Sequence, residues 1–228
     1  MKINLKDYLN KRKIEQLTAV KPRKNCSRCG FSKKTCYCAK IKPFDSKIKF
    51  AILIHQLEID RKIATGRLSH LILKNSHLIR GSDYSDDTQV NALVNDPQNY
   101  CVVLFPGKSS TNLSPLNLEE KKALIPSEKT LVIFVIDGTW ATARHTMRIS
   151  RNLMNLPRFS FELTKPSNFR IRKQPKLECC STVEAIFQTI EHLGPSRNFD
   201  LSLGLHHNLL EVFDYMVDKQ ISFQQNQK

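Results

Sequence analysis

Three short stretches of the chain are almost entirely apolar. They lie at residues 47–55, 100–105 and 130–136. A continuous apolar run of this length is typical of a strand that is buried on both faces of a parallel sheet. We therefore predict three central strands here, and two shorter strands at residues 77–80 and 158–163.

The segments between these strands repeat their apolar residues every three or four positions, which indicates helices. The clearest case begins after Cys180, where Val183 and Ile186 share one face and Ser181 or Thr182 offers an N-terminal cap. Further helices are expected to begin near residue 65 and to cover residues 86–94, 118–124, 140–149 and 202–222.

Strands and helices therefore alternate along most of the chain. This order favours an α/β fold with a largely parallel sheet and helices on both faces. Residues 1–24 are expected to form a short helix followed by a loop, and residues 108–114 a polar loop. At 228 residues the chain has the size of one large domain.

Composition adds a strong positive charge. Lys and Arg together number 36, against 21 Asp and Glu, so the formal net charge is +15. Such a surplus attracts polyanions, which makes nucleic acid the first expected partner and an anionic membrane surface the second. A basic protein with neither partner stays open at this point.

The sequence shows no sign of export or membrane insertion. It contains no run of about 18 apolar residues, and residues 1–13 lack the apolar segment of a signal peptide. Asp7 and Glu15 interrupt the basic residues that a transit peptide would need. We expect a cytoplasmic protein with reduced cysteines, no membrane contact and no obligate protein partner.

Four of the seven cysteines lie within 13 residues, at Cys26, Cys29, Cys36 and Cys38. Four thiolates on a short loop with a turn-forming Gly30 are typical of a tetrahedral structural zinc site. Four reduced thiols without a metal and an iron–sulfur cluster are the alternatives. With four sulfur ligands the ion has no open position, so we expect a structural role.

Polar residues follow each central strand, where open parallel sheets bind their ligands. The third strand leads into Asp137-Gly138-Thr139-Trp140. A partly desolvated carboxylate is a stronger base, Gly138 leaves room beside the backbone, Thr139 can donate a hydrogen bond and Trp140 can stack on a base. The alternative is that Asp137 and Thr139 only cap the next helix while Trp140 fills the core.

A basic stretch, Arg170 to Lys173, precedes the helix that begins near Ser181. Positive charge beside a helix N-terminus suits the binding of phosphate or carboxylate. Cys179 and Cys180 lie between them without a well-placed histidine, so we interpret both as packing residues rather than nucleophiles.

Taken together, these motifs resemble the DTW-domain proteins, the tRNA-uridine aminocarboxypropyltransferases. The resemblance rests on the four cysteines, Glu58 with Thr65-Gly66, Leu104-Phe105-Pro106-Gly107, Asp137-Gly138-Thr139-Trp140, the Arg-x-Arg-Lys stretch at 170–173 and Ser181-Thr182-Val183-Glu184-Ala185. It implies a SPOUT-like fold over residues 46–228 with a C-terminal knot, preceded by a zinc knuckle within residues 1–45.

The resemblance also implies a reaction. The 3-amino-3-carboxypropyl group moves from S-adenosylmethionine to N3 of a uridine in tRNA, and 5′-methylthioadenosine leaves. Asp137 is the expected base, Thr139 is expected to be an orienting hydrogen-bond donor, and Trp140 is expected to stack on the uracil. Arg170, Arg172 and Lys173 are expected to bind the RNA or the cofactor carboxylate. The expected cofactor-binding residues are Leu104, Phe105, Pro106, Gly107, Gly138, Cys180, Ser181, Thr182 and Glu184.

Three other functions remain open on the sequence. One is a SPOUT-type RNA methyltransferase that uses the same cofactor, and another is aminocarboxypropyl transfer to ribosomal RNA. The third is a zinc-knuckle RNA-binding protein without catalysis.

Overall fold

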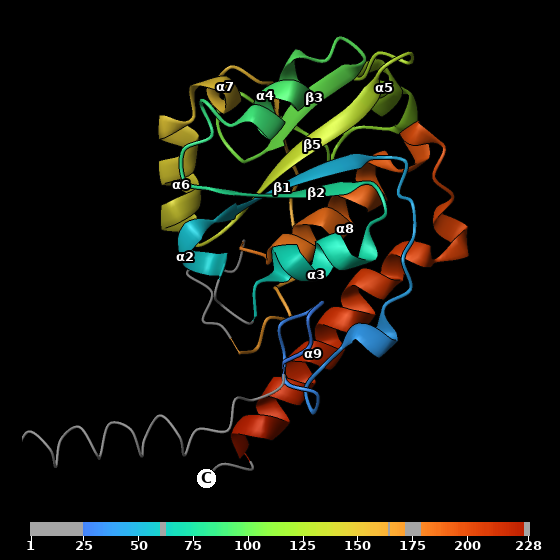
Figure 1. Cartoon of the computed structure of the whole chain (residues 1–228). Helices are drawn as coiled ribbons and strands as arrows, with labels where there is room; N and C mark the ends of the chain where they lie inside the picture. Colours follow the sequence, from blue (N-terminus) through green and yellow to red (C-terminus); the bar gives the residue numbers. More distant parts are fainter. Residues whose placement is uncertain (1–24, 60–62, 164, 172–178, 226–228) are drawn as a thin grey trace, which may run out of the picture.

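The computed structural model describes residues 25–59, 63–163, 165–171 and 179–225. The helix and loop expected for residues 1–24 lie outside this part of the chain. The described residues form an α/β fold built around a single sheet (Figure 1).

In the described part of the chain the sheet has six strands, and every neighbouring pair is parallel. In spatial order the strands are β2 (Ser76–Gly81), β1 (Lys49–His55), β5 (Thr130–Asp137), β3 (Asn99–Leu104), β6 (Arg158–Ser160) and β4 (Ser110–Asn112). The three apolar runs are therefore the adjacent strands β1, β5 and β3, which confirms the predicted parallel sheet.

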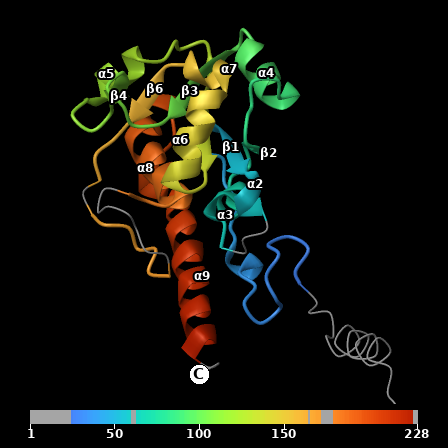
Figure 2. The same cartoon turned by 90° about the vertical axis from the view of Figure 1, so that its left-hand side faces the viewer.

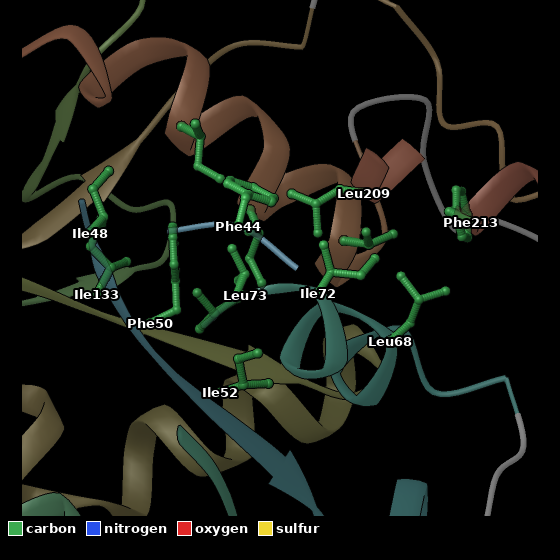
Figure 3. Close-up of a cluster of buried hydrophobic side chains, with 14 of the residues drawn as sticks. Phe44, Ile48, Phe50, Ile52, Leu68, Ile72, Leu73, Ile133, Leu209 and Phe213 are labelled. Carbon is green, nitrogen blue, oxygen red and sulfur yellow. The ribbon is translucent and has the colours of Figure 1, made fainter. Parts of the chain in front are cut away.

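Both faces of the central strands are buried, which explains why their sequences do not alternate with polar residues. In β1, Phe50 and Ile52 point into one buried cluster, while Ala51 and Leu53 point into another. Figure 3 shows the first cluster, in which Phe50 and Ile52 lie with Leu68, Ile72 and other apolar side chains.

Helices cover both faces of the sheet, as the alternation of elements predicts (Figures 1 and 2). One face carries α3 (Thr65–Ile72), α8 (Thr182–Leu193) and α9 (Asn208–Gln225), and the other carries α4 (Thr88–Asn95), α6 (Trp140–Ile149) and α7 (Arg151–Met154). The remaining helices of the described residues are α2 (Gln56–Ile59), α5 (Leu118–Ala123) and four short 3-10 helices, η1 (Cys38–Lys40), η2 (Pro195–Arg197), η3 (Leu201–Leu203) and η4 (Leu205–His207).

Three predicted elements differ in extent. The strand expected at residues 158–163 is β6, which ends at Ser160. The last helix was expected from residue 202, but α9 begins at Asn208, because Gly204 takes a left-handed conformation (φ 64°) that separates η3 from η4. The predicted polar loop at 108–114 contains the edge strand β4, which pairs with β6. Three polar residues with no buried face leave no hydrophobic pattern for a prediction.

The cysteine segment packs onto the same core as the sheet. Cys29, Phe31 and Tyr37 belong to the buried cluster that contains α3 and α9. Two hydrogen bonds join this end of the chain to α9, because Asn208 accepts from the backbone of Lys42 and donates to Lys40. Within the described residues, no helix combines the length and the apolar character that a membrane span requires.

Candidate active site

The carboxyl ends of the central strands surround a cavity of about 890 Å³. Its wall comes from the ends of β3, β5 and β6, the first turns of α6 and α8, and Thr65 of α3. Because the strands are parallel, these ends lie at one edge of the sheet, which is where open α/β sheets bind their ligands. The strand-end motifs of the sequence therefore meet at one place.

Asp137 is the last residue of β5 and lies next to this cavity. Only 5% of the residue is exposed, and it lies behind the cavity wall rather than in it. The Thr182 hydroxyl, which does line the cavity, donates a hydrogen bond of 2.5 Å to Asp137 Oδ1. A residue of α8 thus connects the buried carboxyl to the cavity.

Gly66 of α3 lies against the other side of the Asp137 carboxyl. A Cβ added to Gly66 would lie 2.7 Å from both Cγ and Oδ2 of Asp137. Such a distance is too short for a methyl carbon, which cannot form a hydrogen bond, so only glycine lets the helix approach the carboxyl this closely. This contact gives a physical reason for the Thr65-Gly66 pair noted in the sequence.

The two residues after Gly138 have separate structural tasks. Thr139 is the N-cap of α6, and its hydroxyl accepts a hydrogen bond of 3.1 Å from the backbone of Thr142. Trp140 and Phe105 both line the cavity, and their rings pack against each other with centroids 6.2 Å apart. Thr139 therefore caps the helix while also lining the cavity, and Trp140 presents an aromatic surface there.

Glu184 holds a loop to the start of α8 instead of lining the cavity. It completes a capping box with Ser181, whose backbone N–H donates to it at 2.7 Å. The same carboxylate also accepts from the Ser167 hydroxyl at 2.6 Å and from the Asn168 backbone at 2.7 Å. Its negative charge thus compensates the positive end of the α8 dipole.

The two adjacent cysteines have the character of packing residues. Cys179 is buried, and burial raises the pKa of Cys180 to about 12. A thiol with that pKa stays protonated at neutral pH and is a poor nucleophile. This agrees with the interpretation from the sequence.

The basic stretch is only partly described. Arg170 Nη2 lies 2.6 Å from Asp218 Oδ1 of α9, so its charge is already paired. Arg172 and Lys173 lie outside the described residues. The charged side chains that the structure does place in the cavity wall are Arg144 of α6 and Glu162 after β6.

Most of the predicted catalytic and cofactor-binding residues meet at the cavity. Those in its wall are Leu104, Phe105, Pro106, Gly138, Thr139, Trp140, Cys180, Ser181 and Thr182. Gly107, Asp137 and Glu184 do not line it. The sequence prediction missed Arg144, although Arg144 follows Trp140 by four residues and so shares its helical face. It also did not assign residues 159–163 to the site, although it predicted a strand at residues 158–163.

The four predicted metal ligands converge. Their sulfur atoms lie within 4.8 Å of one another, with Cys26 Sγ 3.7 Å from Cys38 Sγ and Cys29 Sγ 3.6 Å from Cys36 Sγ. A tetrahedral zinc ion with bonds of about 2.3 Å separates its sulfurs by about 3.8 Å. Backbone amides of Cys29 and Arg28 lower the pKa of Cys26 to about 6, whereas burial raises the pKa of Cys29 and Cys38, a cost that a bound cation would offset. The cluster therefore fits a zinc ion.

The cysteine loop also touches the helix that carries Gly66. Gly30 takes a left-handed conformation (φ 78°), and a Cβ there would lie 2.9 Å from Nη1 of Arg67. Arg67 Nη2 in turn donates to the carbonyl of Ile59 at 2.9 Å. The cysteine loop, α3 and Asp137 are thus in successive contact.

The motifs and their arrangement agree with a comparison against protein families, in which the DTW domain profile matches residues 23–221. The chain belongs to the DTW domain family. The DTW motif itself is the segment that leaves β5 at Asp137, so the family's namesake residues lie at the cavity.

Curated relatives of this DTW domain protein carry a common name. A mouse protein named tRNA-uridine aminocarboxypropyltransferase 2 is 28% identical over 167 residues, which cover 71% of this chain and 54% of the relative. Proteins of the same name from Macaca fascicularis and Drosophila melanogaster are 25% and 23% identical, over 72% and 74% of this chain and 54% and 66% of theirs. The chain spans about half the length of the first two relatives. No solved structure matches it significantly.

Proposed function

We propose that this protein transfers the 3-amino-3-carboxypropyl group of S-adenosylmethionine to N3 of a uridine in tRNA. The observation that carries the proposal is the buried Asp137, hydrogen bonded to Thr182 behind the wall of an 890 Å³ cavity. Membership of the DTW domain family and the names of the curated relatives support the same reaction.

The residues fit the chemistry that this reaction needs. S-adenosylmethionine supplies a carbon made electrophilic by the adjacent sulfonium. As uridine N3 bonds to that carbon, the carbon–sulfur bond breaks, sulfur keeps the electron pair as 5′-methylthioadenosine, and the N3 proton must be removed. The Thr182 hydroxyl takes this proton while it passes its own to Asp137, which is therefore the final base. Trp140 and Phe105 provide aromatic faces for stacking in the cavity.

tRNA is the proposed macromolecular partner. The net charge of +15 favours a polyanion, and the curated relatives are named for tRNA. Arg172 and Lys173, together with exposed basic residues of the described part of the chain, are proposed to contact its phosphates. A cytoplasmic setting suits both this substrate and cysteines that form no disulfide among the described residues.

The fold is proposed to be SPOUT-like, with a C-terminal knot. Support comes from the all-parallel sheet and from the return of residues 179–182 to the ends of β3 and β5. We further propose that residues 1–45 form a zinc-bearing N-terminal segment and residues 46–228 the catalytic domain. Cys26, Cys29, Cys36 and Cys38 would hold the ion, whose chemistry there is structural.

The proposed reaction is tested with purified protein, tRNA and S-adenosylmethionine labelled either in the methyl group or in the carboxypropyl carbons. Mass spectrometry of the digested nucleosides is expected to show carboxypropyl label on uridine. Asp137→Asn keeps the shape of the side chain but removes the base, so the rate should fall by about 100- to 10,000-fold. Asp86→Asn, at an exposed position, serves as the control for loss of one negative charge.

Each alternative function predicts a different outcome. Methyl label in the RNA would identify a methyltransferase, and product on ribosomal RNA alone would change the substrate. RNA binding with no label on any uridine, unaltered by Asp137→Asn, would indicate a binding protein without catalysis.

A further inference from the structure

The cavity wall contains very few charges. Among the described residues that line it, Arg144 is the one cation and Glu162 the one carboxylate. Glu162 Oε1 already accepts a hydrogen bond of 2.9 Å from Asn112. Arg144 is exposed, and it forms no ion pair or hydrogen bond with any described residue. Its guanidinium is therefore available to a ligand in the cavity.

Two other positive elements near the cavity, both in the described part of the chain, are already compensated. Arg170 is paired with Asp218 of α9. The N-terminus of α8 reaches the wall at Ser181 and Thr182, but the Glu184 carboxylate satisfies the Ser181 backbone N–H there and adds a negative charge. A second anion at that helix end would be repelled. Among the described residues that line the cavity, Arg144 is the cation that remains for an anionic group.

Arg144 also lies beside the DTW motif, whose residues are proposed to carry the reaction. It lies on α6 one helical turn after Trp140, so both side chains project from the same face of the helix. Both residues line the cavity, together with Ala143 between them. Arg144 is thus held beside the DTW motif by a regular helix rather than by a loop.

We propose that Arg144 binds the α-carboxylate of the amino-acid part of S-adenosylmethionine. This inference rests on the proposed function, since it names the residue that recognises the group to be transferred. A guanidinium matches a carboxylate with two parallel hydrogen bonds, which fixes the direction of the group as well as its charge. The carboxylate travels with the transferred group, so Arg144 holds the migrating fragment and not the departing nucleoside.

The test compares three ligands by calorimetry with the full chain. S-adenosylmethionine carries the carboxylate, decarboxylated S-adenosylmethionine lacks it, and 5′-methylthioadenosine lacks the whole amino-acid part. The unmodified protein should prefer the first ligand over the second by about 10- to 100-fold. Arg144→Met should bring that preference to about one while leaving the affinity for 5′-methylthioadenosine unchanged, which also shows that the variant is folded.

Arg148→Met is the matched control, because Arg148 is exposed on the same helix and does not line the cavity. It should keep the preference of the unmodified protein. If Arg144→Met also keeps the preference, or weakens tRNA binding alone, the assignment is wrong. The two proposals can fail separately. If RNA carries methyl label but the preference for S-adenosylmethionine over its decarboxylated form still depends on Arg144, the proposed reaction is wrong and the role of Arg144 in carboxylate binding stands. If the unmodified protein binds none of the three ligands, both proposals fail.

Discussion

The contact between Gly66 and Asp137 leads to a quantitative prediction for Gly66→Ala. The new Cβ would lie 2.7 Å from Cγ and Oδ2 of Asp137, whereas ordinary contact begins near 3.4 Å, so one side must move by about 0.7 Å. Asp137 has little room to move, because its Oδ1 is held by Thr182 at 2.5 Å and its backbone belongs to the central strand β5.

Two opposing terms set the change in stability. Overpacking of a buried site costs about 1–3 kcal/mol. Alanine recovers at most about 0.5–1 kcal/mol relative to glycine inside a helix, and Gly66 is only the second residue of α3. We expect the free energy of unfolding to fall by about 1–2 kcal/mol, which for a chain of this size lowers the melting temperature by roughly 2–8 °C.

The effect on catalysis should be larger than the effect on stability. A displacement of the Asp137–Thr182 pair by several tenths of an ångström misaligns the proton acceptor, and misplacement by about 1 Å can cost 100-fold in rate. We expect uridine modification to fall by about 10- to 100-fold under conditions where the protein remains folded, as measured by nucleoside mass spectrometry and thermal denaturation.

A double-mutant cycle with Asp137→Ala identifies the source of the strain. Gly66→Ala should destabilise the Asp137→Ala protein less than the unmodified protein, because the Cγ and Oδ2 atoms are gone. Some cost should remain, since the Cβ of residue 137 would still lie 2.9 Å away. Equal destabilisation in both backgrounds, or a fully active and more stable Gly66→Ala, would refute the reasoning.

Two further predictions concern the hydroxyl of Thr182 and the cysteine cluster. Thr182→Val removes the donor to the buried carboxylate and should cost about 1.5–3 kcal/mol of stability along with most of the activity, whereas Thr182→Ser should retain activity. Equal activity of the two variants would exclude the hydroxyl from proton transfer. Metal analysis should find one zinc ion per chain, and Cys29→Ser should lose it and melt at a lower temperature. Cys101→Ser, at a buried cysteine outside the cluster, should keep the zinc, and a Cys29→Ser protein with full zinc content would contradict the assignment.

Local patterns in the sequence were sufficient to predict five of the six strands in the described sheet and most helices. The three apolar runs are the adjacent strands β1, β5 and β3, because a strand buried on both faces requires apolar residues at every position. Ser181 with Glu184 forms the predicted cap of α8, since capping depends on residues three apart. The candidate site at the end of β5 was also predicted from a local pattern, because a polar motif directly follows an apolar strand there.

The partners of these residues were decided only by the tertiary structure. Asp137 meets Thr182, which is 45 residues away in the chain, and it meets Gly66 from the opposite side. Arg170 is paired with Asp218 on α9, while Arg144 remains available in the cavity. A sequence shows which side chains carry charge or can donate a hydrogen bond. Which of them are already satisfied depends on long-range packing, and this packing decides which groups remain for a ligand.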